Sequence, residues 1–429
     1  MTEPLTHASE EVAEQPLQPR RGILADTTPL RENPNYRRWW FGYTLSFTGT
    51  QLTQFAIPFQ VYQLTHSSLA VGALGVVVLV PLVTMGLFGG AIADATDRRR
   101  LTLITSSGLL VLSSLLTLQA VLDLRQVWVL YAIAAMQGAF SAVDSSARGA
   151  ILPRLVRREL MPAANALGQL GFNSGLTAGP LLGGLLVATV GFGWTYGLDA
   201  LSFAAVLYGI WRLPAMPPPE GASRAGVASV LEGLRFLGPR KNLLMTFLVD
   251  INAMVFGMPR ALFPAIGTTW FHGGAGTVGL LAAAPSVGAL VGATFSGWAG
   301  RIHRQGRAVL VAVVVWGASI ALFGFTRVLW LGLLLLAIAG GADMVSAIFR
   351  NTILQVATPD ALRGRLQGVF IVVVTGGPRV GDFEAGAVAN AFGLTASVLS
   401  GGLACIAGVG LLASRFPSFA RYDARDPVP

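Results

Sequence analysis

The chain has 429 residues, of which 53% are hydrophobic and only 12% are charged, and its mean hydropathy is +0.62. Soluble domains carry roughly 25% charged residues, so this composition excludes an ordinary soluble protein and a disordered one. The single cysteine, Cys405, excludes an internal disulfide framework. The net charge of +9 would suit a nucleic-acid binder, and the placement of the arginines decides between that class and a membrane protein.

Twelve apolar runs follow one another along the chain, and each is close to the ~20 residues that a membrane-crossing helix needs. They lack the period-2 alternation of an outer-membrane barrel. Helices satisfy all backbone groups within one segment, so the sequence predicts an all-α integral membrane protein. The twelve spans are expected at 39–63, 69–93, 101–122, 127–147, 161–190, 194–213, 242–266, 276–300, 308–325, 328–349, 366–391 and 395–416.

Polar segments at the two ends and in the middle divide the chain into five parts. Residues 1–36 are expected to form a disordered cytoplasmic tail without a cleavable signal peptide, because no apolar run precedes residue 39. The proline-rich segment 214–240 is expected to be a cytoplasmic linker. It would join a six-helix bundle at 37–213 to a second one at 241–416, and residues 417–429 would form a C-terminal cytoplasmic tail.

The basic residues are distributed unevenly between the two sides of the predicted membrane domain. When the N-terminal tail is taken as cytoplasmic, all but four of the 30 Lys and Arg fall on that side. The other side has only Arg125 and Arg327, while Arg260 and Arg379 lie inside spans. Basic residues concentrate on the cytoplasmic side of membrane proteins. We therefore expect a multi-pass protein of the plasma (inner) membrane with both termini in the cytoplasm, and no nucleic acid as partner.

An internal repeat relates the two bundles at an offset of 202 residues without gaps. Matching pairs include Gly86 with Gly288, Gly90 with Gly292, Arg99 with Arg301, Arg148 with Arg350, Leu152 with Leu354, Gly175 with Gly377 and Gly179 with Gly381. The offset corresponds to six spans, an even number, so the two halves run parallel about an axis along the membrane normal. Two such six-helix pseudo-repeats are the arrangement of a major facilitator transporter.

The segment 86–100, at the inner end of the second span, resembles the major facilitator loop signature G-x-x-x-D-R-x-G-R-R. Ala95 and Asp97 depart from that signature. The resemblance implies a latch that holds the cytoplasmic side closed in one state, made of Gly90, Asp94, Arg98 and Arg148. The alternative is that these basic residues serve membrane topology alone.

Span 5 contains a glycine-rich segment that resembles the antiporter motif G-x-x-x-G-P-x-x-G-G of major facilitator exporters. Glycines allow helices to approach closely, and a proline inside a helix frees a backbone carbonyl and bends it. The resemblance implies an exporter, while the alternative is ordinary glycine packing between membrane helices. The motif residues are Gly175, Gly179, Pro180, Gly183 and Gly184.

Charged residues inside spans are costly and usually functional. A carboxylate shielded from water can take up and release protons. The candidate proton-coupling residues are Asp250 of span 7 and Asp382 and Glu384 of span 11. For each of them the alternative is a static pair with an arginine that locks two helices together. Span 1 has no acidic residue, so no proton site is expected there.

The predicted substrate contacts combine permanent cations with aromatic surfaces: Arg260, Arg379, Phe172, Trp194 and Tyr196. The planar guanidinium of Arg260 can pair with oxygens or stack on a ring. A competing account pairs Arg260 with Asp382, which would only hold spans 7 and 11 together. Aromatic residues at the outer ends of spans can also mark the membrane interface.

Several strings between about 35 and 415 resemble the enterobactin exporter family. Among them are PFQVYQLTHSS from Pro58, WTYGL from Trp194, RALFPA from Arg260 and LQVATPDALRGR from Leu354. The resemblance implies a proton-motive-force-driven inner-membrane exporter of a catecholate siderophore. The same branch contains antibiotic and multidrug exporters, which are the alternative within this class. A non-transporting membrane sensor or scaffold is the alternative of another class, although twelve spans leave little room for an output domain.

The sequence predicts no enzyme. It contains no G-x-x-x-x-G-K-[ST] loop for ATP, no nucleophile–His–acid arrangement, and four histidines too scattered for a metal site. We therefore expect no cofactor and the proton gradient as the energy source. The expected partners are a small-molecule substrate and the lipid bilayer, with the protein acting as a monomer.

Overall fold

The computed structural model describes residues 26–149, 151–217, 232, 234–358, 360–423 and 425; within these ranges the side chains of 91, 94, 360–365, 367, 368 and 371 are not described. In the described part of the chain every regular element is a helix. The predicted linker is therefore described only at its two ends, and residues 1–25 lie outside the description.

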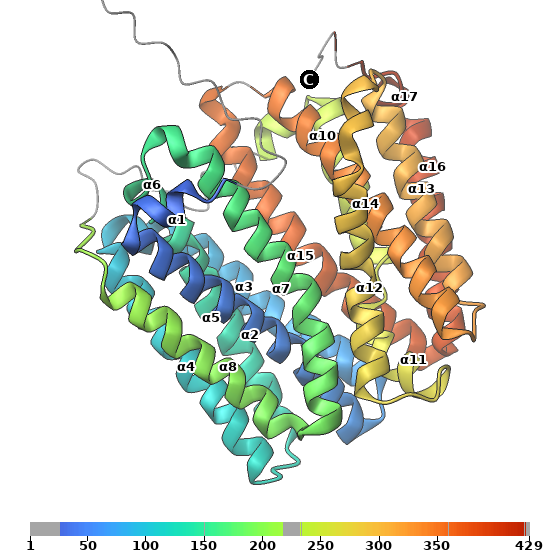
Figure 1. The fold of residues 1–429 in the computed structure, drawn as a ribbon. Coiled ribbons are helices and arrows are strands. Elements are labelled where there is room, and N and C mark those ends of the chain that lie inside the picture. The colour runs from blue at the N-terminus through green and yellow to red at the C-terminus, as the bar shows by residue number, and fades with distance from the viewer. Residues whose placement is uncertain are drawn as a thin grey trace, which may run out of the picture.

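Six long helices make up the N-terminal half and six helical spans the C-terminal half (Figure 1). The first six are α2 (Pro34–Thr65), α3 (Ser68–Ala95), α4 (Arg98–Val121), α5 (Val127–Gly149), α7 (Met161–Thr189) and α8 (Gly191–Trp211). The second six are α10 (Lys241–Phe256) continued by η2 (Arg260–Leu262) and α11 (Phe263–Thr269), then α12 (Ala275–Thr294), α13 (Gln305–Phe323), α14 (Leu329–Ala357), α15 (Asp360–Phe392) and α16 (Leu394–Arg415). Short helices at the chain connections are α1 (Thr28–Glu32), α6 (Leu152–Leu155), η1 (Arg158–Leu160), η3 (Ser296–Arg301) and α17 (Pro417–Ala420).

Nine of these described segments are long and apolar enough to cross a membrane. The three further long helices, α2, α8 and α15, have 32, 21 and 33 residues. Each still has the length that a spanning helix requires. The predicted all-α membrane fold with twelve spans is confirmed.

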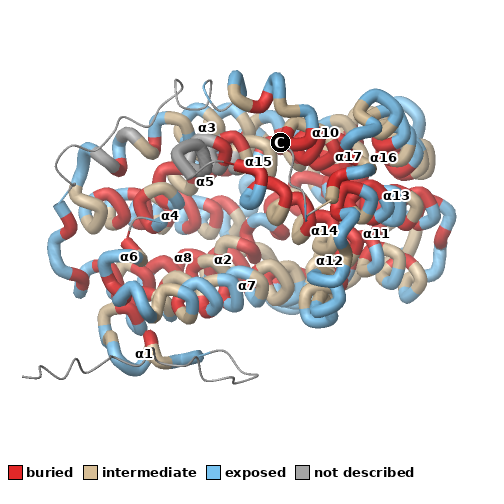
Figure 2. The backbone as a smooth tube through the Cα atoms, turned by 90° about the horizontal axis from the view of Figure 1, so that it is seen from above, coloured by how far each residue is buried: buried red, intermediate tan, exposed pale blue. Residues whose placement is uncertain are grey.

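Helix pairing is repeated between the two halves. In the N-terminal half α2 packs on α7, α3 on α5 and α4 on α8. The corresponding pairs of the C-terminal half are α10 with α15, α12 with α14 and α13 with α16. Seen from above, the halves lie beside each other, and exposed residues follow the periphery (Figure 2). The predicted pair of six-helix pseudo-repeats is therefore present in the packing.

Two seams join the halves, one between α3 and α15 and one between α7 and α12. We call the end of the bundle where α2 and α10 begin the terminal end, and the opposite end the far end. Both seams contain close backbone approaches near the far end. A Cβ added to Gly386 would be 2.6 Å from the carbonyl oxygen of Ser68, and one added to Gly184 would be 2.6 Å from that of Ala275. The far end is therefore sealed by glycine contacts.

Two boundaries differ from the sequence prediction. The segment expected to be a disordered tail up to residue 36 contains α1, and Asn33 caps α2 by accepting hydrogen bonds from the backbone N–H groups of Asn35 and Tyr36. The Asn33 amide also donates to the carbonyl of Leu155 at 2.5 Å. At the other end of the chain Phe419 of α17 is fully buried against the bundle. The chain segments before the first span and after the last span therefore contact the helix bundle.

Candidate functional site

The seventh span is broken in its middle, where the sequence predicted one continuous run over 242–266. α10 ends before Gly257, and Pro259 lacks the N–H that a continuing helix would need. The indole N–H of Trp316 donates to the freed carbonyl of Gly257 at 2.7 Å. The chain then forms the short 3₁₀ turn η2 before α11 starts. Transporters commonly build binding sites at such discontinuous helices.

Arg260 stands on the 3₁₀ turn at this break and is solvent-accessible. Two carboxylates, Asp343 of α14 and Asp382 of α15, lie within its electrostatic range. The guanidinium of Arg379 is the fourth charge of this group, which we call the Arg260 cluster. Three of its four members were predicted as site residues, and the structure brings these three together.

A second charge group lies on α10 and α14. Asp250 of α10 forms an ion pair with Arg350 of α14, and the two residues are only 2% and 6% exposed. A further nitrogen of Arg350 is 3.6 Å from a carboxylate oxygen of Asp343. Because Asp343 also faces Arg260, it links the two groups. The C-terminal half therefore contains a continuous series of alternating charges from Asp250 to Asp382.

Arg350 and Asp343 were not predicted as site residues. The signal for Arg350 was present in the sequence, because it matches Arg148 in the internal repeat. Asp343 precedes Arg350 by seven residues, which is two helical turns and places both on one face of α14. The feature that indicated this pair was therefore an acidic residue inside a span, on the same helix face as an arginine that recurs in the internal repeat.

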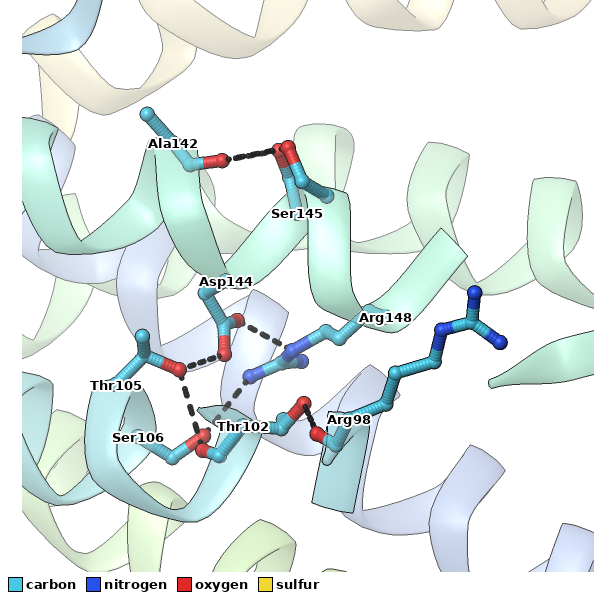
Figure 3. A network of polar contacts seen from close by, with 9 residues as sticks. Arg98, Thr102, Thr105, Ser106, Ala142, Asp144, Ser145 and Arg148 are labelled. Atoms are coloured by element: carbon cyan, nitrogen blue, oxygen red, sulfur yellow. Dashed lines mark hydrogen bonds and ion pairs between the residues drawn. The ribbon is translucent and has the colours of Figure 1, made fainter. Parts of the chain in front are cut away.

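The matching arginine of the N-terminal half is paired differently. Arg148 forms an ion pair with Asp144, one turn earlier on α5. Thr105 donates to the Asp144 carboxylate at 2.6 Å (Figure 3). The Arg148 guanidinium lies 4.8 Å from the ring centroid of Tyr43. Both members of the pair are buried. Each half of the molecule thus holds one buried arginine in a carboxylate pair at repeat-related positions.

The structure describes only part of the predicted cytoplasmic latch. Arg148 forms an ion pair with Asp144, and the Arg98 side chain extends away from that pair (Figure 3). The side chain of Asp94 lies outside the described residues, and Gly90 is a half-buried residue of α3. The latch roles of these four residues remain predictions.

Neighbouring residues of the same loop make contacts that the sequence did not reveal. Asp97 caps α4 through the N–H of Arg100 and accepts a hydrogen bond from the N–H of Met216 at 2.7 Å. Arg99 donates to the carbonyls of Ile210 and Trp211 at the end of α8. This loop therefore holds the start of α4 to the end of α8.

The glycines of the predicted antiporter motif serve two packing surfaces. Gly175, Gly179 and Gly183 recur every four residues and lie against Phe47, Gln51 and Phe55 of α2. Gly184 faces the other half, where a Cβ would be 3.0 Å from the Cα of Gly279. Pro180 lies inside α7, and its carbonyl approaches Gly279. The motif thus packs spans 1 and 5 together and also forms the α7–α12 seam.

The three aromatic residues predicted to bind substrate are scattered. Phe172 is 39% exposed and stacks on Phe47 with ring centroids 5.0 Å apart. Trp194 is 68% exposed at the far end of the bundle. Tyr196 is fully buried, and its hydroxyl donates to Gln60 at 2.8 Å. Tyr196 therefore offers no surface to a ligand in this conformation, because it fills the interface between α2 and α8.

The two acidic candidates of span 11 also separate. Asp382 belongs to the Arg260 cluster, whereas Glu384 lies two residues further along α15. Two residues correspond to about 200° of rotation around a helix, so the two carboxylates leave α15 on different sides. Glu384 is half-buried. The geometry favours Asp382 over Glu384 as a partner of Arg260.

Sequence comparisons match most of the chain to proteins of one kind. The model of the "transmembrane secretion effector" family matches residues 25–428. The enterobactin exporter EntS of Citrobacter koseri is 30% identical over 417 residues, covering 96% of this chain and 98% of that protein. EntS of an Escherichia coli O81 strain is 31% identical over 369 residues, covering 84% and 87%.

Solved structures of low sequence identity share the fold. A bacterial homologue of the human lysosomal transporter Spinster, described as inward-facing and unoccupied, gives a TM-score of 0.70 at 16% identity, covering 94% of this chain and all of the other. A bacterial homologue of the iron transporter ferroportin gives 0.66 at 15% identity, covering 90% and 98%. The chain therefore belongs to the transmembrane secretion effector family of major facilitator transporters.

Proposed function

We propose that this protein exports a weakly acidic, aromatic small molecule, most simply a catecholate siderophore, by alternating access driven by the proton motive force. The enterobactin exporters that match nearly the whole chain support this substrate class. The single observation that carries the proposal is Arg260, an accessible cation on the break of span 7 with carboxylates beside it. A phenolate oxygen can pair with such a guanidinium, and the ring can stack on it.

The sealed far end supports an arrangement in which substrate enters from the terminal end. The concentration of basic residues there supports a cytoplasmic terminal end in the plasma membrane. Both halves of the pathway come from one chain, which supports a working monomer with the bilayer and the substrate as its partners.

Protons would act through the series of charges that ends at Arg260. Export driven by an inward proton gradient requires that the proton and the substrate exclude each other at the site. Ionised Asp343 and Asp382 would hold the Arg260 guanidinium in place for a substrate that arrives from the cytoplasm. A proton taken up by either carboxylate from outside would loosen that arrangement and release the substrate there, and loss of the proton to the cytoplasm would reset the site. Asp250 would work in the same way on Arg350. Proton binding and substrate binding are thereby linked through shared arginines, as reciprocal coupling requires.

Arg260→Gln should weaken export of an anionic substrate by about tenfold or more, because a hydrogen bond to a charged group contributes about 1.5–3 kcal/mol. The measurement is uptake of enterobactin into inverted membrane vesicles under an imposed proton gradient. Its O-methylated derivative, which cannot form a phenolate, serves as the uncharged comparison and should lose much less.

The double variant Arg260→Gln/Asp382→Asn separates substrate contact from a merely structural pair. If Arg260 contacts the substrate, the second change does not restore export of the anion. Recovery of export in the double variant would show instead that the single variant failed through an unpaired carboxylate. Vesicles that move antibiotics but no catecholate would contradict the proposed substrate class.

A further inference from the structure

A groove on the periphery of the C-terminal half is unrelated to the charges described above. It lies between η3, α13 and α14 and has a volume of about 560 Å³. Apart from two arginines, all lining residues are apolar or glycine. Trp298, Val311, Val315 and Ile338 line it and are 40–54% exposed. On membrane-spanning helices such accessible apolar side chains face lipid.

The two arginines stand at one end of this groove. Arg304 is the N-cap of α13, and Arg307 lies in the first turn of that helix. Val311 and Val315 follow Arg307 by one and two turns. The groove therefore begins with positive charge at the terminal end of the bundle and continues along apolar walls toward its middle.

These arginines occupy an electrostatically unfavourable place. The N-terminus of a helix carries partial positive charge, which favours anions and disfavours cations. The first turn of α13 has no acidic residue, and its N-cap makes no side-chain hydrogen bond. In the described part of the chain neither guanidinium has a hydrogen bond or ion pair. Among the described residues of the nearby C-terminal segment, the Asp423 carboxylate is bonded to Arg425.

The repeat-related place in the N-terminal half shows what is missing. There Asp97 caps α4, and Arg99 donates to the carbonyls that end α8. The position before the first residue of α13, where α4 has Asp97, is occupied by Arg304. The start of α13 thus lacks the carboxylate that neutralises the start of α4.

We propose that this groove binds an anionic phospholipid, with its phosphate on Arg304 and Arg307 and an acyl chain along Val311, Val315 and Ile338. A phosphate there supplies the negative charge that Asp97 supplies in the other half. A free phosphate ion would leave the apolar walls uncovered, whereas a phospholipid satisfies both parts of the groove. Trp298 lies at the same end, where tryptophan commonly marks the level of lipid headgroups. Basic pockets between membrane helices bind anionic headgroups in this way.

The test is native mass spectrometry of the full chain, purified in detergent and titrated with phosphatidylglycerol or phosphatidylcholine. Wild-type protein should bind phosphatidylglycerol about tenfold more tightly than phosphatidylcholine, since each arginine near an anionic headgroup contributes to affinity. Arg304→Gln/Arg307→Gln should lose that preference. Arg301→Gln removes the same charge from the same loop but lies outside the groove, and it should behave as wild type.

Val315→Trp fills the apolar part of the groove while keeping both arginines, so it remains informative if the double arginine variant does not fold. It should bind phosphatidylglycerol about tenfold more weakly than wild type. Equal binding of the two lipids to wild type, or equal losses in Arg301→Gln and in the double variant, would overturn the proposal. Full displacement of phosphatidylglycerol by inorganic phosphate would also overturn it.

Discussion

Gly184→Leu should reduce export by at least about tenfold while the protein still inserts into the membrane. A Cβ at this position would be 2.6 Å from the carbonyl oxygen of Ala275 and 3.0 Å from the Cα of Gly279. Both are backbone atoms, which cannot turn aside as a side chain can. Overpacking costs about 1–3 kcal/mol even in cores that can adjust, and 1.4 kcal/mol changes a population tenfold. The sealed far end would therefore become a rare state, and a cycle that passes through it would stall.

Gly168→Leu is the matched control on the same helix. A Cβ on Gly168 meets no atom within 4 Å among the described residues, so this change adds the same side chain without disturbing a seam. Export by Gly168→Leu should stay near the wild-type value. Export by Gly184→Leu at the wild-type rate would show that the α7–α12 seam is not needed for transport.

Arg350→Gln should be the most destabilising single charge change in the protein. It leaves two carboxylates, Asp250 and Asp343, without the cation that faces both. Removing one partner of a buried pair costs about 3–5 kcal/mol. Asp250→Asn should cost less, because Arg350 retains Asp343 at 3.6 Å. The measurements are thermal stability of the purified protein and its abundance in the membrane.

The same variants separate a structural pair from a proton carrier. Arg350→Gln/Asp250→Asn should regain stability relative to Arg350→Gln, since fewer unpaired charges remain buried. Proton-driven uphill export should stay lost in Asp250→Asn, while downhill exchange of substrate continues. Arg350→Lys keeps the charge and serves as the control for loss of the guanidinium shape. Normal uphill export by Asp250→Asn would remove Asp250 from the coupling mechanism.

The fold could be predicted from the sequence because hydropathy determines which segments cross a bilayer. The prediction erred where charge and backbone chemistry override mean hydropathy. The tenth run was expected to end at residue 349, yet α14 continues to Ala357. Arg350 is buried within this helix and paired with Asp250, which mean hydropathy does not register. The seventh run was expected to be continuous, and the Gly257–Pro259 segment interrupts it.

The site could be predicted only in part, because some of its ion pairs join residues that lie far apart in the sequence. The Asp144–Arg148 pair has a spacing of four residues, which is readable as one helix face, although it was overlooked. Asp250 and Arg350 are a hundred residues apart, and a single sequence contains no signal for their contact. The burial of Tyr196 could not be predicted for a related reason, since an aromatic residue near a span end gives no indication of which neighbour covers it.

Export by alternating access requires that the sealed far end opens during transport. The most direct measurement is labelling of Ala275→Cys by a membrane-impermeant maleimide added outside the cell, in a Cys405→Ala background. Ala275 is only 5% exposed at the α7–α12 seam, whereas Thr189→Cys, exposed at the same end of α7, is the control for reagent access. We predict that Ala275→Cys is protected at rest and becomes labelled when substrate and a proton gradient are both present. Protection that persists while export proceeds, or labelling that is equal under all conditions, would contradict the account.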